Sequence, residues 1–142
     1  LDLDSIPGWT GGKKLKSLLL TPTRLYSPIT EEIFGNDKIE VKGIANITGG
    51  GFYDNIDRII PKSMDAVIYT DKWEVPPVFT ALKDMGNISE EEMFHVFNMG
   101  IGMVMIISPS SIEDLKECVR AKDEDIVILG EIAGGTGKVL VK

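Results

Sequence analysis

The sequence predicts an α/β (α+β) fold, in which one layered domain has a mixed β-sheet flanked by helices. Apolar strand-like segments alternate with helical segments along most of the chain, which is typical of such layered domains. A Gly-rich turn near the end is followed by a last apolar strand. The 142 residues are 43% hydrophobic, enough for one compact core, so residues 1–142 are treated as a single domain.

The amino-terminal third is expected to be partly irregular. Residues 1–12 are rich in Gly and turn-forming residues and are expected to form a loop. Thr21 and Pro22 suit an N-cap and a first helical position, so a helix is expected over residues 21–34. Pro28 should kink or interrupt this helix, because proline lacks the backbone N–H that the helix needs.

The rest of the chain alternates between the two kinds of element. Strands are expected at residues 39–47, 65–70, 101–107 and 126–132. Helices are expected at residues 52–60, 76–85, 89–97 and 110–121. Ser89 and Glu92 form a capping box for the third of these helices. The nearly continuous apolar run 101–107 predicts a central strand covered on both faces. Residues 134–137 predict a hairpin turn into a strand at 139–141.

Composition excludes several classes of function. The net charge of −7, from 22 acidic and 15 basic residues, argues against a nucleic-acid partner, since phosphate backbones are bound by basic surfaces. No apolar run approaches the roughly 18 residues of a membrane span. The single Cys118 excludes an internal disulfide and fits a reducing, cytoplasmic location. With one His and one Cys, the usual closed zinc site cannot form, and no metal site is expected in this chain.

One segment could carry chemistry. Thr48, Gly49, Gly50 and Gly51 link an expected strand to an expected helix, the position where ligands bind in open α/β sheets. Successive glycines leave backbone N–H groups able to surround an anion, and Thr48 adds a hydroxyl. Asn55 lies one helical turn on and could reach the same space. These residues are therefore candidates for phosphate binding, although three glycines can also form a simple tight connection.

Other polar residues are weaker candidates. Arg58 lies too far along the expected helix and should face solvent or a neighbouring domain. The carboxylates of residues 90–92 fit a role in stabilising a helix start. His95 is expected to be half-buried or paired at the surface. Glycines flanking residue 101 indicate close approach of another backbone or a ligand to a strand.

Three sequence blocks, taken in their order along the chain, resemble those of a known family. TPTRLY at residues 21–26, ITGGGFYDNI at 47–56 and MFHVFNMGIGM at 93–103 resemble the carboxy-terminal domain of the phosphoribosylformylglycinamidine cyclo-ligase (AIR synthetase) family. The resemblance runs from about residue 18 to about residue 141 and implies that family's carboxy-terminal α/β fold. It does not include the family's His-Ser-Asn-Gly segment, so the first strand and helix of the domain, and the amino-terminal ATP-binding domain, are expected to be absent from this chain.

The resemblance also implies an activity. In the family, ATP activates the formyl oxygen of formylglycinamidine ribonucleotide, and the amidine nitrogen closes the imidazole ring to give aminoimidazole ribonucleotide in purine biosynthesis. ATP and Mg²⁺ would act through the absent amino-terminal domain, so this chain is expected to be inactive by itself and to hold the substrate phosphate. A homodimer is expected. Asn46 stands where relatives often have His, and Asn cannot take a proton at neutral pH, so the catalytic residues stay unassigned.

Two alternatives stay open from the sequence. The chain could be a non-catalytic phosphate-binding or dimerisation module. It could also belong to another enzyme of the same ATP-dependent superfamily, such as selenophosphate synthetase, thiamine-monophosphate kinase, formylglycinamidine ribonucleotide synthase or a hydrogenase-maturation factor. The TGGGF and FNMGIGM blocks disfavour this second alternative.

Overall fold

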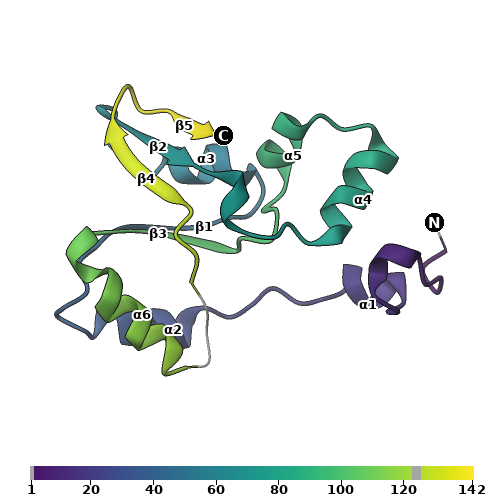
Figure 1. The fold of residues 1–142 in the computed structure, drawn as a ribbon, viewed down its shortest axis with the longest axis horizontal. Helices are drawn as coiled ribbons and strands as arrows, with labels where there is room; N and C mark the ends of the chain where they lie inside the picture. Colours follow the sequence, from purple (N-terminus) through teal and green to yellow (C-terminus); the bar gives the residue numbers. More distant parts are fainter. Residues whose placement is uncertain (1, 123–125) are drawn as a thin grey trace.

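A computed structural model describes residues 2–122 and 126–142. The helices are α1 (Leu15–Leu19), α2 (Ser27–Phe34), α3 (Gly51–Asp57), α4 (Pro77–Gly86), α5 (Glu90–Val96) and α6 (Ile112–Arg120). The strands are β1 (Val41–Asn46), β2 (Met64–Ile68), β3 (Met103–Ile107), β4 (Gly130–Gly134) and β5 (Val139–Val141). Short 3₁₀ turns are η1 (Gly8–Thr10), η2 (Thr70–Lys72) and η3 (Pro109–Ser111). The predicted α+β class is confirmed, and its helices flank two sheets (Figure 1).

The strands form two separate sheets within the described residues. β1 and β3 make an antiparallel ribbon in which Asn46 lies opposite Met103. β4, β2 and β5 make a mixed sheet in that order, with β2 antiparallel to β4 and parallel to β5. The predicted mixed sheet is therefore present, but the ribbon of β1 and β3 is not joined to it by hydrogen-bonded strands.

The core lies in two clusters, one on each face of the β1–β3 ribbon. The larger cluster joins α3 and α5 to β1, β2 and β3, with Phe52, Ile56 and Met93 fully buried at its centre. Phe52 stacks on Trp73 with ring centroids 5.8 Å apart. The smaller cluster joins α2 and α6 through Ile33 and residues of α6. In Figure 1, α2 and α6 lie side by side on the opposite side of the ribbon from α3 and α5.

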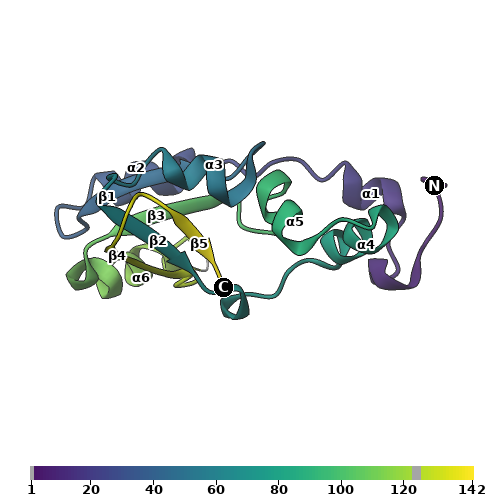
Figure 2. The same cartoon turned by 90° about the horizontal axis from the view of Figure 1, so that it is seen from above.

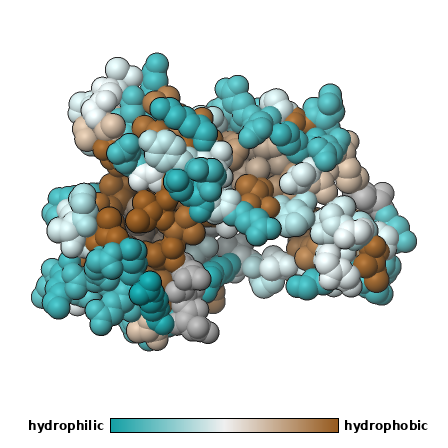
Figure 3. Space-filling view, in the orientation of Figure 1, coloured by the Kyte–Doolittle hydropathy of each residue, from teal (hydrophilic) through white to brown (hydrophobic). Residues whose placement is uncertain are grey.

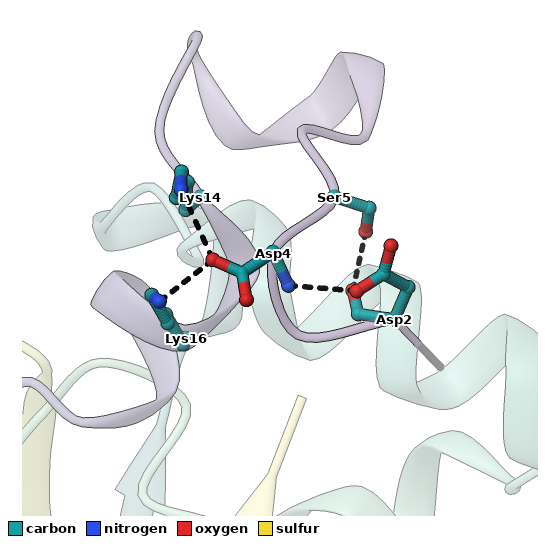
Figure 4. Close-up of polar contacts among 5 residues, drawn as sticks. All are labelled: Asp2, Asp4, Ser5, Lys14 and Lys16. Carbon is teal, nitrogen blue, oxygen red and sulfur yellow. Dashed lines mark hydrogen bonds and ion pairs between the residues drawn. The ribbon is translucent and has the colours of Figure 1, made fainter.

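The amino-terminal residues form a small unit at the far end of the molecule, beside α4 (Figures 1 and 2). The Asp4 carboxylate forms ion pairs with the ammonium groups of Lys14 at 3.0 Å and Lys16 at 2.6 Å (Figure 4). These two ammonium groups lower the pKa of Asp4. Asp2 helps to close the same turn, because its side chain accepts the Asp4 N–H and its carbonyl accepts the Ser5 hydroxyl.

Two expectations for the first 34 residues are wrong. The segment between α1 and α2 is extended, and the helix begins at Ser27, so Pro28 occupies its first turn instead of interrupting it. This placement satisfies proline, because first-turn N–H groups have no partner within a helix. The short helix α1, which the sequence reading did not place, precedes the extended segment.

Three expectations for the second half are also corrected. The strand expected at residues 126–132 begins at Gly130, and the Leu129 carbonyl just before it accepts the Tyr69 N–H at 2.8 Å. The turn at residues 134–137 does not form a hairpin, because β4 and β5 each pair with β2 and not with one another. The run 101–107 does form β3, but β3 pairs with β1 and with no second strand among the described residues, so it is not central in its sheet.

Candidate functional site

The Gly-rich loop lies where the sequence placed it, between the end of β1 and the start of α3. Its backbone needs glycine at two positions: φ is +91° at Gly50 and +55° at Gly51, in the left-handed region that side chains disfavour. Thr48 and Gly49 are exposed, whereas Gly51 is buried. The loop therefore has one face open to solvent and one face packed against the domain.

Asn55 braces the loop from inside. The buried Asn55 side chain donates from Nδ2 to the carbonyl oxygens of Gly51 at 2.8 Å, Gly49 at 3.2 Å and Thr48 at 3.4 Å. Such a shared amide satisfies polar backbone groups that would otherwise be costly to bury. The expectation that Asn55 reaches the loop is met, but its N–H groups are directed at protein carbonyls.

This bracing decides where the loop amides point. In a trans peptide the N–H is directed opposite to the carbonyl of the preceding residue. Because the Thr48 and Gly49 carbonyls face Asn55, the N–H groups of Gly49 and Gly50 face away from it. The Gly51 N–H is engaged differently, since it donates to the Thr48 carbonyl at 3.0 Å. The loop thus directs two adjacent amides outward and uses the third in its own turn.

The packed face of the loop touches α5. A Cβ built on Gly51 would lie 2.0 Å from the Phe94 carbonyl oxygen and 2.8 Å from the His95 carbonyl carbon, closer than real Cβ atoms approach. Any side chain at Gly51 would therefore push α3 and α5 apart. Glycine at this position serves helix packing as well as backbone conformation.

Acidic and aromatic groups surround the loop. A Cβ on Gly50 would lie 2.8 Å from a carboxylate oxygen of Asp54, so this acidic group lies directly beside the loop. Tyr53 stacks on His95 with ring centroids 4.0 Å apart and an interplanar angle of 22°. Burial, and to a smaller extent the Glu91 carboxylate, raise the pKa of Tyr53 above its ordinary value.

One known protein family matches nearly the whole chain. Residues 2–142 match the family described as AIR synthase related protein, C-terminal domain. The chain belongs to this family. A relative named phosphoribosylformylglycinamidine cyclo-ligase from Caldanaerobacter subterraneus subsp. tengcongensis is 43% identical over 130 residues, covering 92% of this chain and 38% of the relative. The chloroplastic protein of that name from Arabidopsis thaliana is 42% identical over 134 residues, covering 94% of this chain and 33% of the relative.

A third relative of the same name, from Lachnospira eligens, is 43% identical over 124 residues, covering 87% of this chain and 36% of the relative. The chain thus spans about a third of the length of the curated relatives that it matches. The similarity confirms the resemblance predicted from the three sequence blocks, and it extends beyond them into the amino-terminal residues.

The other residues that the sequence singled out in this AIR synthase related domain lie outside the Gly-rich loop. Arg58 is exposed, as expected. The N-cap role of Ser89 is confirmed, since its hydroxyl accepts the Glu92 N–H at 3.2 Å. A Cβ on Gly102 would lie 2.1 Å from the Tyr26 hydroxyl, so the group that approaches this glycine is a side chain and not the expected backbone or ligand. Asn46 is exposed at the end of β1.

The sequence reading missed two neighbours of the loop. The approach of Asp54 to Gly50 could have been found, since residues four apart meet on a helix. The stack of Tyr53 on His95 joins α3 to α5 and had no local signal. Within residues 2–122 and 126–142, no group of three or more His, Cys, Asp or Glu side chains could hold a metal ion. In the same part of the chain, no helix has the length and apolar character needed to cross a membrane.

Proposed function

We propose that this chain is the carboxy-terminal domain of an ATP-dependent cyclo-ligase that converts formylglycinamidine ribonucleotide to aminoimidazole ribonucleotide in purine biosynthesis. The observation that carries the proposal is the 42–43% identity to proteins of this name over nearly the whole chain. The exposed face of that loop supports a role in binding the nucleotide substrate.

The loop is proposed to hold the ribose 5′-phosphate of the substrate. The outward N–H groups of Gly49 and Gly50 and the exposed Thr48 side chain offer adjacent hydrogen-bond donors, a grouping suited to phosphate oxygens. Asn55 and Gly51 act indirectly, the first by turning the loop carbonyls inward and the second by allowing α5 to pack beneath it.

The remaining chemistry is proposed to lie outside this chain. ATP and Mg²⁺ are proposed to bind in an amino-terminal domain of the same protein, as the similarity to a carboxy-terminal domain of the AIR synthetase family implies. The proposed enzyme is a cytoplasmic homodimer. The chain by itself is expected to show no turnover, because phosphoryl transfer requires bound ATP and metal at the reacting group.

Gly49→Val in the full-length protein tests the loop. Gly49 has open space around its Cα and no positive φ, so valine fits without disturbing the fold, yet it stands where the phosphate would approach. The expected result is a KM for formylglycinamidine ribonucleotide raised at least about tenfold, equivalent to 1.4 kcal/mol of lost binding. Gly8→Val is the matched control, since Gly8 also has open surroundings but lies in η1, far from the loop.

The outcomes separate the alternatives. Unchanged kinetics for Gly49→Val would remove the loop from the substrate site. A full-length protein that forms no aminoimidazole ribonucleotide but still binds inorganic phosphate at the loop would favour the non-catalytic binding module. Turnover of a different substrate by the intact protein would assign it to another enzyme of the superfamily.

A further inference from the structure

The chain that follows α5 returns to the Gly-rich loop. α5 touches one end of the loop, since a Cβ on Gly51 would lie 2.0 Å from the Phe94 carbonyl oxygen. The other end is held by the residue that precedes β3, because the Gly102 carbonyl accepts the Ile47 N–H at 2.9 Å. The residues between these two contacts, 97–101, therefore form a second loop beside the Gly-rich loop, here called the return loop.

The return loop has an unusual backbone that its neighbours hold in place. Met99 has a φ of +50°, a left-handed value that residues other than glycine rarely adopt, and Gly100 follows with a φ of +95°. The Trp73 Nε1–H donates to the Met99 carbonyl at 2.9 Å, and a Cβ on Gly100 would lie 2.5 Å from Pro76. Strained residues of this kind persist only where their surroundings fix them, and they cluster at active sites and ligand-binding loops.

Asn98 opens this turn and presents an unused side-chain donor. Its Oδ1 accepts the Gly100 N–H at 3.0 Å, which fixes the orientation of the amide, because only the oxygen can accept. In the part of the chain that the structure describes, its Nδ2 has no hydrogen-bond partner, and no buried side-chain nitrogen or oxygen there lacks one. The Nδ2 group of the half-buried Asn98 therefore reaches the surface, with two N–H groups available to a ligand.

A large hollow of the molecule lies apart from this donor. It has a volume of about 1050 Å³, and its mainly apolar lining forms a brown surface beside α6 in Figure 3. Gly100 and Gly102 line it, whereas Asn98 and residues 48–51 do not. Burying a phosphate among apolar side chains is costly, so the polar surface formed by Asn98 and the Gly-rich loop is the better place for it.

Asn36 forms the same kind of turn at a distant place. Its Oδ1 accepts the Lys38 N–H at 3.1 Å, and its side chain is also half-buried. Asn36 precedes β1, whereas the Gly-rich loop follows it, so the six residues of β1 separate the two by roughly 20 Å. The turn alone therefore does not mark a site; what distinguishes Asn98 is the strained backbone that follows it and its place beside the Gly-rich loop.

We propose that Asn98 is a further substrate-binding residue, whose Nδ2 donates a hydrogen bond to the ribose 5′-phosphate held by the Gly49 and Gly50 amides. The proposal rests on the proposed function and adds a donor from a different part of the chain. An uncharged amide suits this place, because it donates to phosphate oxygens without the repulsion that a carboxylate would exert.

Asn98→Asp in the full-length protein tests the donor. A carboxylate can still accept the Gly100 N–H, so the turn is kept, but it has no N–H to donate and it repels a phosphate. The dissociation constant for ribose 5-phosphate, measured by calorimetry, and the KM for formylglycinamidine ribonucleotide should both rise at least about tenfold, the loss expected for one hydrogen bond to a charged group. The kcat should change little, because the phosphate is not the reacting group.

Two further variants separate the donor from the turn and from net charge. Asn98→Ser removes the amide without adding charge, and its hydroxyl can close a similar turn, so it should also weaken binding. Asn36→Asp adds the same charge in the same kind of turn and should leave both constants unchanged. Wild-type binding by Asn98→Asp would overturn the proposal, and equal weakening by Asn36→Asp would assign the effect to net charge and overturn it too.

Asparagine side-chain signals give a test that does not depend on the stability of a variant. In full-length protein labelled with ¹⁵N-asparagine, saturating ribose 5-phosphate should shift the Asn98 Nδ2 signal and leave the Asn36 signal in place. An unshifted Asn98 signal would overturn the proposal.

Activity separates this proposal from the proposed function. A shifted Asn98 signal together with no cyclo-ligase turnover would retain Asn98 as a phosphate ligand and reject the function. Turnover with a KM that Gly49→Val raises and Asn98→Asp does not would retain the function and the Gly-rich loop and reject Asn98.

Discussion

The replacement Gly51→Ala tests the packing of the loop on α5. The new Cβ would lie 2.0 Å from the Phe94 carbonyl oxygen, whereas real Cβ atoms essentially never come within 3.0 Å, so α5 must move by at least about 1 Å. A left-handed φ of +55° costs alanine about 1–2 kcal/mol, and forcing extra volume into a packed site costs about 1–3 kcal/mol. We expect Gly51→Ala to lower the free energy of unfolding by about 2–5 kcal/mol.

Urea unfolding followed by tryptophan fluorescence measures this loss, since Trp73 stacks on Phe52 in the same core. Gly49→Ala is the matched control, because Gly49 has open surroundings and no positive φ, and its unfolding free energy should change by no more than about 0.5 kcal/mol. Equal stability of the two variants would show that α5 does not pack against Gly51 and would refute the reasoning.

Three further predictions concern single side chains. Asn55→Ala removes a buried amide that donates to three loop carbonyls and should cost about 1–3 kcal/mol in urea unfolding. Asn46→Ala, at an exposed position, should change stability by less than about 0.5 kcal/mol, and a similar cost for both would contradict the bracing role. The backbone N–H groups of Lys138 and Thr136 lower the pKa of Asp65 from 3.8. The stabilising effect of the Asp65 carboxylate is therefore present above pH 3.8 and is lost as the pH falls through the lower pKa of the folded state. Asp65→Asn should flatten this part of the curve of stability against pH. Burial raises the pKa of Cys118, so iodoacetamide should modify it more slowly at pH 7 than a free cysteine in solution, and equal rates would contradict its placement.

Elements with a complete local signal were predictable. The start of α5 follows from Ser89 and Glu92, whose contact needs no other part of the chain. The helix that begins at Ser27 was placed too early, because Thr21 and Pro22 form a good local start and Pro28, in the first turn of α2, forms another. Local preference could not decide between two acceptable starts.

Strand pairing was less predictable because its partners are distant in sequence. The turn at residues 134–137 favours a hairpin locally, yet β2 lies between β4 and β5. The Asp65 carboxylate on β2 accepts the Thr136 N–H at 2.7 Å and the Lys138 N–H at 2.8 Å, which holds the turn across β2. A carboxylate about 70 positions earlier in the chain thus overrides the local preference.

The position of the candidate site was predictable, but its internal geometry was not. A strand followed by Thr48 and three glycines indicates a loop with available amides, and the structure has that loop at the end of β1. Which amides remain available depends on the Asn55 side chain and on the turn closed by the Gly51 N–H. Those contacts appear only once α3 and α5 are packed together.

The charge around the loop limits what it can bind without help. The chain carries a net charge of −7, and the Asp54 carboxylate lies beside Gly50, so neither long-range attraction nor the immediate surroundings favour a phosphate dianion. Two outward-facing amides and a hydroxyl can orient a phosphate by hydrogen bonds, but they offset little of its negative charge. A phosphate bound at this loop would therefore need compensating charge from other parts of the full-length protein. It follows that inorganic phosphate should bind this chain weakly and the intact protein more tightly.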